Sequence, residues 1–99
     1  MTDQTKALNV IDRQIRELDT IYKQASQDLN TVRGKERVTR WKKETVALLT
    51  QHVGQPEAQR LAALASGPSF TNDLLEELSD EVEEYRVFLV GLLDQAKKQ

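Results

Sequence analysis

Apolar residues recur at alternating intervals of three and four in two long stretches of the chain. The first stretch comprises Leu8, Ile11, Ile15, Leu18, Tyr22, Ala25, Leu29 and Val32. The last comprises Leu75, Leu78, Val82, Tyr85, Leu89, Leu92 and Ala96. This spacing places one apolar stripe along the side of a helix. The pattern therefore predicts two long helices, over residues 5–32 and 71–98, whose stripes pack against other helices.

A glycine follows the end of the first stripe. Glycine costs about 1 kcal/mol inside a helix but little just beyond its end. We therefore predict a tight turn at Arg33, Gly34 and Lys35, which joins the first helix to an antiparallel second helix over residues 36–52. One unbroken helix continuing past Gly34 is the alternative. The second helix carries Trp41, which is expected to pack between helices or, alternatively, to anchor a partner.

Turn residues also mark the remaining boundaries. Gly54 can close the second helix in a left-handed conformation, and Pro56 suits the start of a third, short helix over residues 56–66. At the start of the last helix, Thr71 is a good N-cap, and Phe70 can pack on Leu75.

The composition narrows the class of protein. The 99 residues suffice for a single domain, and glycine and proline are rare. We predict an all-α fold: an antiparallel bundle of three longer helices and one short helix, with an open side as a variant. The chain has no cysteine and no long apolar run, and no basic and apolar leader opens it. A cytoplasmic protein without a membrane segment is expected.

Charge is unevenly distributed along the chain. Because the net charge is only −2, no general attraction to nucleic acid is expected. Two segments are nevertheless candidates for charged docking. The basic one contains Arg33, Lys35, Arg37, Arg40, Lys42 and Lys43, and the acidic one contains Asp73, Glu76, Glu77, Asp80, Glu81, Glu83 and Glu84. They can be two solvated faces, or they can steer association with another chain. Nucleic-acid binding by the basic segment is the alternative.

The side of the last helix opposite its apolar stripe changes character along its length. It is acidic through Glu84 and then reads Val87, Val90, Gly91 and Asp94. A glycine inside a helix is easier to explain where another backbone approaches closely. We predict that these four residues bind a partner or a second copy. Coverage of Val87 and Val90 by the short helix or by the N-terminal arm is the alternative.

Residues for catalysis are sparse. His52 is the only histidine, and its place near a helix C-terminus indicates a capping role. No spacing typical of a metal site, phosphate loop or activated nucleophile occurs. The sequence therefore predicts no enzyme activity, no cofactor, no metal and no small-molecule substrate.

One segment resembles a known group of proteins. Trp41, the run Glu44 to Leu49, and Val53-Gly54-Gln55 resemble small helical domains that accompany TIR-like or other nucleotide-signalling effectors in bacterial phage defence. In that pattern an aromatic residue usually stands where this chain has Val53. The resemblance implies an accessory role, such as oligomerising or docking an effector. Together with the helical pattern, it predicts a protein–protein interaction or oligomerisation module that forms a homo-oligomer or binds a protein partner.

Overall fold

The computed structural model describes residues 4–28, 30–64 and 74–98 of the chain. These residues form α1 (Gln4–Asp28), α2 (Thr31–His52), α3 (Gln55–Ala63) and α4 (Leu74–Lys97), and the described ranges contain no strand. The predicted all-α fold, with three longer helices and one short one, is confirmed.

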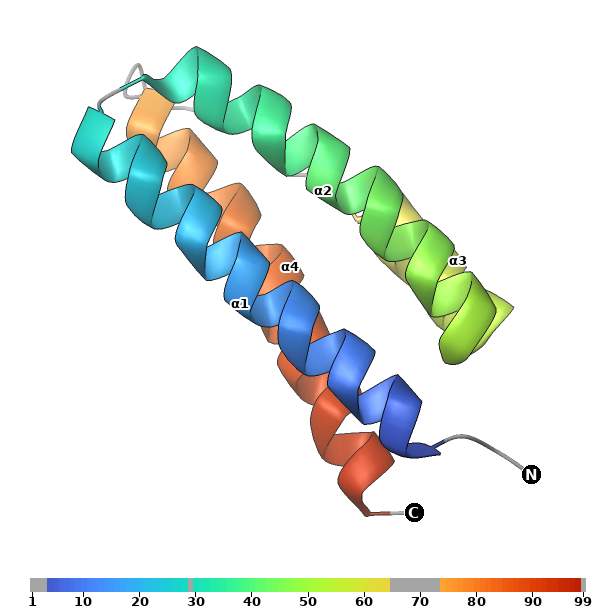
Figure 1. Ribbon diagram of the computed structural model, residues 1–99. Helices are drawn as coiled ribbons and strands as arrows, with labels where there is room; N and C mark the ends of the chain where they lie inside the picture. Colours follow the sequence, from blue (N-terminus) through green and yellow to red (C-terminus); the bar gives the residue numbers. More distant parts are fainter. Residues whose placement is uncertain (1–3, 29, 65–73, 99) are drawn as a thin grey trace.

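The three long helices lie side by side in an elongated body measuring 48 × 24 × 21 Å. Both α2 and α4 run antiparallel to α1, and α3 folds back along the C-terminal part of α2 (Figure 1). Helices α2 and α4 contact each other less than either contacts α1. A groove of about 410 Å³ lies between their N-terminal halves, so the part of the bundle formed by the described residues is open along this side.

The predicted apolar stripes form the core. Each helix contributes at least one side chain that is completely buried, as Ile11, Leu49, Leu61 and Leu89 are. Burial of a leucine or isoleucine of this kind contributes about 1.5–3 kcal/mol relative to leaving the side chain exposed. The rest of the core comes from the two stripes, from α2 and from α3: Ile15, Leu18, Ala25, Val38, Trp41, Ala58, Leu78, Val82, Tyr85 and Leu92.

The predicted turn at Gly34 is wrong. Helix α1 ends at Asp28, and α2 begins at Thr31 rather than near residue 36. The Asn30 side chain caps α2 by accepting a hydrogen bond from the Arg33 backbone N–H at 3.1 Å. Gly34 lies inside the helix and is buried. A Cβ at this position would lie 2.7 Å from the Ala25 Cβ, so the glycine allows two helices to approach closely.

Other helix boundaries also differ from the predicted ones. Because α1 ends at Asp28, Val32 belongs to α2, where it is 65% exposed instead of filling the first stripe. Gly54 has an extended backbone and forms the N-cap of α3, while Val53 caps α2, so a left-handed Gly54 is also wrong. Pro56 stands at the start of α3, as predicted, and α3 ends at Ala63 rather than near residue 66. The predicted Thr71 cap and the contact of Phe70 with Leu75 lie outside the described residues.

The prediction that Trp41 packs between helices is confirmed. Its side chain is 2% exposed, and its ring lies 5.8 Å from the Tyr85 ring, centroid to centroid. The indole N–H donates to the backbone carbonyl of Gln14 on α1. Trp41 therefore joins α1, α2 and α4 near the middle of the bundle.

Candidate interaction surface

The side of α4 that faces away from α1 carries an exposed apolar residue. Val87 is 60% exposed and, with Val32, is one of two large hydrophobic residues exposed within the described part of the chain. Val87 is two residues before Leu89, which is completely buried. Residues two apart point about 200° from each other on a helix, so burial of Leu89 against α1 directs Val87 outwards.

Gly91 lies one turn beyond Val87 on the same side. It is exposed, and a Cβ built there would meet no atom within 4 Å. The described residues therefore supply no close neighbour to explain a glycine in this helix. This contrasts with Gly34, where the neighbouring helix leaves no room for a side chain.

The other two residues of the predicted site differ in exposure. Val90 is partly buried and packs against the core. Asp94 is exposed, as Val87 is, and α3 does not cover either of them. The structure thus leaves Val87, Gly91 and Asp94 accessible and places Val90 at the edge of the same surface.

Charged residues continue this surface towards both ends of α4. Lys98 follows the last helical residue, but its backbone N–H still donates to the carbonyl oxygens of Asp94 and Gln95, at 3.3 and 3.2 Å. It therefore stays in helical register. We define the outer stripe as the exposed residues that recur at intervals of three or four along this side of α4: Glu76, Asp80, Glu83, Val87, Gly91, Asp94 and Lys98.

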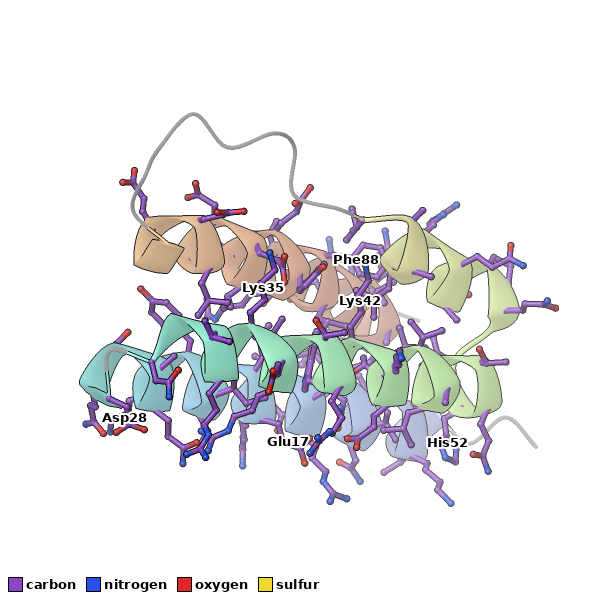
Figure 2. The ribbon with its side chains drawn as sticks, turned by 90° about the horizontal axis from the view of Figure 1, so that it is seen from above. Glu17, Asp28, Lys35, Lys42, His52 and Phe88 are labelled. Atoms are coloured by element: carbon purple, nitrogen blue, oxygen red, sulfur yellow. The ribbon has the colours of Figure 1, made fainter. Side chains whose placement is uncertain are left out.

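The basic segment of α2 does not form a single cationic face. Figure 2 shows Lys35 and Lys42 on the side of α2 that faces α4. The Lys35 ammonium lies 4.0 Å from a carboxylate oxygen of Glu77. The Lys42 ammonium donates to the backbone carbonyl of Leu64 and lies 5.0 Å from the centroid of the Tyr85 ring.

The remaining basic residues lie elsewhere on α2. Arg37 donates to the Gln24 side chain of α1 at 2.9 Å, whereas Arg33, Arg40 and Lys43 are exposed. In the acidic segment, Glu76, Asp80 and Glu83 are exposed, whereas Glu77, Glu81 and Glu84 are partly buried, and Asp73 lies outside the described residues. Some of the charged residues of these two segments thus contact groups of their own chain, as Lys35 and Arg37 do.

Sequence reasoning missed the groove between α2 and α4. Val32, Thr39 and Leu78 line it, and Lys35, Glu36, Glu77 and Glu81 surround them. The spacing of apolar residues predicts Val32 on the first helix, so the pattern does not place it beside Leu78. The signal that could have revealed it is the capping pattern of Asn30, which moves the start of α2 ahead of Val32.

The chemistry of the described residues is limited. His52 lies in the last turn of α2, as predicted. Within residues 4–28, 30–64 and 74–98, no three histidine or carboxylate side chains are arranged to hold a metal ion. No helix in these ranges has the length and hydropathy needed to cross a membrane.

The residues that carry the resemblance to defence-associated helical domains include three that are buried in the interior. Trp41, Thr45 and Leu49 are buried, so in this fold they hold helices together. Comparisons of the chain with protein-family models, with curated proteins and with solved structures find no match.

Proposed function

We propose that the protein is a non-catalytic helical module for protein–protein interaction and that the outer stripe of α4, flanked by Val90, is its docking surface. The observation that carries this proposal is the pair formed by Val87, which is 60% exposed, and Gly91, which has open space around it. Burial of an exposed valine by a partner stabilises the complex, and a nearby glycine lets the backbone of that partner come close.

The apolar part of the docking surface is small, so its burial supports a moderate affinity for a partner. Complete burial of one valine contributes about 1.5–3 kcal/mol, and Val90 is already partly covered by its own chain. Stable interfaces normally bury about 1,200–2,000 Å² in total. The charged ends of the outer stripe must therefore contribute area and orientation to the interface.

Substitution of Val87 tests this proposal against a matched control. Val87→Glu places a charge on the docking surface and should abolish or weaken association, whereas Val32→Glu changes an equally exposed valine on α2 and should not. Multi-angle light scattering over a range of concentrations measures self-association. Pull-down with the tagged chain measures other partners, and circular dichroism checks that helicity is unchanged. Equal association of both variants and the unmodified chain would contradict the proposal.

A role in nucleic-acid binding receives no specific support, because Lys35, Arg37 and Lys42 already have partners within the chain. Retention of DNA or RNA in filter binding at about 50 mM salt, where phosphate contacts are strong, would favour that role instead. An accessory role beside a bacterial defence effector rests only on the resemblance of residues 41–55, and co-purification with such an effector tests it.

A further inference from the structure

The outer stripe of α4 is charged asymmetrically from one end to the other. Its N-terminal part carries Glu76, Asp80 and Glu83, and Lys98 stands at its C-terminal end. A second α4 packed in parallel would place each of these acids beside its own copy, which is repulsive. A second α4 packed antiparallel would bring Lys98 towards the acidic end. For two copies of α4, the charge pattern therefore favours the antiparallel arrangement over the parallel one.

The apolar part of the outer stripe independently selects a register. Val87 and Gly91 are four residues apart, which is about 6 Å along a helix axis. In an antiparallel pair centred on position 89, each Val87 lies opposite Gly91 of the other copy. The open space around Gly91 can then receive the valine side chain, as a knob enters a hole.

The same register also aligns the charges. Asp80 and Lys98 are equally distant from position 89, so they lie opposite each other in this pair. By symmetry the contact occurs twice. The contact of Val87 with Gly91 and the contact of Asp80 with Lys98 thus share one centre, position 89.

We propose that the partner of the outer stripe is a second copy of this chain, packed through α4 antiparallel to α4 with Val87 opposite Gly91. This inference rests on the proposed interaction function and specifies its partner and geometry. It has one electrostatic cost. Asp94 lies opposite Glu84 and next to Glu83 of the second copy, and Lys97 and Lys98 lie nearby to offset the repulsion.

Cysteine cross-linking tests the direction, because the chain has no cysteine of its own. Chains with Asp80→Cys and chains with Lys98→Cys are mixed and oxidised, or treated with a short thiol-to-thiol linker. The antiparallel pair predicts a cross-link between the two kinds of chain and little between identical ones. In the control, chains with Arg13→Cys, on the exposed side of α1, take the place of one of the two variants in the mixture. This mixture should give no specific cross-link.

The outcomes separate this inference from the proposed function. Cross-linking of Asp80→Cys chains to each other would overturn the antiparallel arrangement while leaving a self-association function. A chain that is monomeric at all concentrations but captures another protein in a Val87-dependent manner would overturn the second copy as partner and leave the interaction function. Absence of any association would overturn both.

Charge exchange supplies a second readout. Asp80→Lys and Lys98→Asp should each raise the dimer dissociation constant about threefold to tenfold at low salt, and the double variant should restore it. Asp94→Lys should lower the dissociation constant, because it removes the repulsion from Glu83. These differences should shrink at about 1 M salt, where screening acts within about 3 Å. A double variant as weak as the single ones would overturn the pairing of Asp80 with Lys98.

Discussion

The indole Nε1–H of Trp41 donates to the backbone carbonyl oxygen of Gln14 at 2.9 Å, and the Gln14 side chain returns to the helix that carries Trp41. The Gln14 Nε2 donates to the Thr45 hydroxyl at 2.8 Å, and that hydroxyl donates to the Trp41 carbonyl oxygen at 2.7 Å. Gln14 and Thr45 are 1% and 0% exposed. These hydrogen bonds fix the register of α1 against α2, since sliding either helix would break them inside the core.

The buried pair of Gln14 and Thr45 predicts non-additive mutations. Thr45→Val leaves the Gln14 amide without its acceptor and should lower the free energy of unfolding by about 1–3 kcal/mol. Gln14→Met should cost about 1 kcal/mol, since the Thr45 hydroxyl keeps its bond to the Trp41 carbonyl. The double variant should cost less than the two single changes together. Urea denaturation of the four proteins measures this, and strict additivity would contradict the coupling.

A methyl group at Gly34 should destabilise the bundle. The added Cβ would lie 2.7 Å from the Ala25 Cβ and 3.0 Å from a methyl carbon of Leu78, so the helices must separate. Overpacking of this kind typically lowers the free energy of unfolding by about 1–3 kcal/mol, and the better helix propensity of alanine offsets about 1 kcal/mol of this loss. We expect Gly34→Ala to lower the midpoint of thermal unfolding. The double variant Gly34→Ala/Ala25→Gly should recover part of the loss, and failure to do so would place the strain elsewhere.

The same substitution at Gly91 should have the opposite effect on the single chain. Because nothing lies near the new Cβ, Gly91→Ala should raise the free energy of unfolding by about 1 kcal/mol through helix propensity. If Val87 of a second copy packs on Gly91, the same methyl should weaken association. Denaturation at low concentration and light scattering at high concentration measure the two effects separately. Stronger association of Gly91→Ala would contradict close packing at this residue.

Tyr85 predicts a loss of stability at high pH. Burial, and then the carboxylates of Glu81 and Glu84, raise the pKa of its hydroxyl from 10.0 to about 12. The folded state therefore holds the proton more strongly than the unfolded state does. This stability is complete below pH 10 and is lost between pH 10 and 12, with a total of about 2–3 kcal/mol. Comparing the pH dependence of unfolding with that of Tyr85→Phe isolates the effect from lysine titration. Parallel curves would contradict it.

Lys42 should hold α3 in place. Its ammonium bonds to the Leu64 carbonyl at the end of α3 and lies over the Tyr85 ring of α4. Lys42→Met keeps the apolar stem but removes both contacts, at an expected cost of about 1–2 kcal/mol. Hydrogen exchange should accelerate mainly at the α3 amides. Lys43→Met, at an exposed neighbouring position, is the control and should change stability by less than about 0.5 kcal/mol.

Local patterning was enough to predict the helices and most of the core. The intervals of three and four that include Leu89 and Leu92 define a buried side whatever the helix packs against, and both residues are buried. The exposure of Val87 follows from the same geometry, because a helix that buries one side must present the other. The outer side of α4 could therefore be predicted as a candidate surface before any contact was known.

Only the tertiary structure decided the surroundings of Gly34 and Gly91, the partners of several basic residues and the groove between α2 and α4. Gly34 in a turn and Gly34 in a close helix crossing look the same along the chain, and the proximity of Ala25 distinguishes them. Likewise, the sequence alone does not pair Gln14 with Thr45, which is 31 positions away. Helix periodicity is local, so the sequence by itself determined it, whereas these contacts depend on which sides of separate helices meet in space.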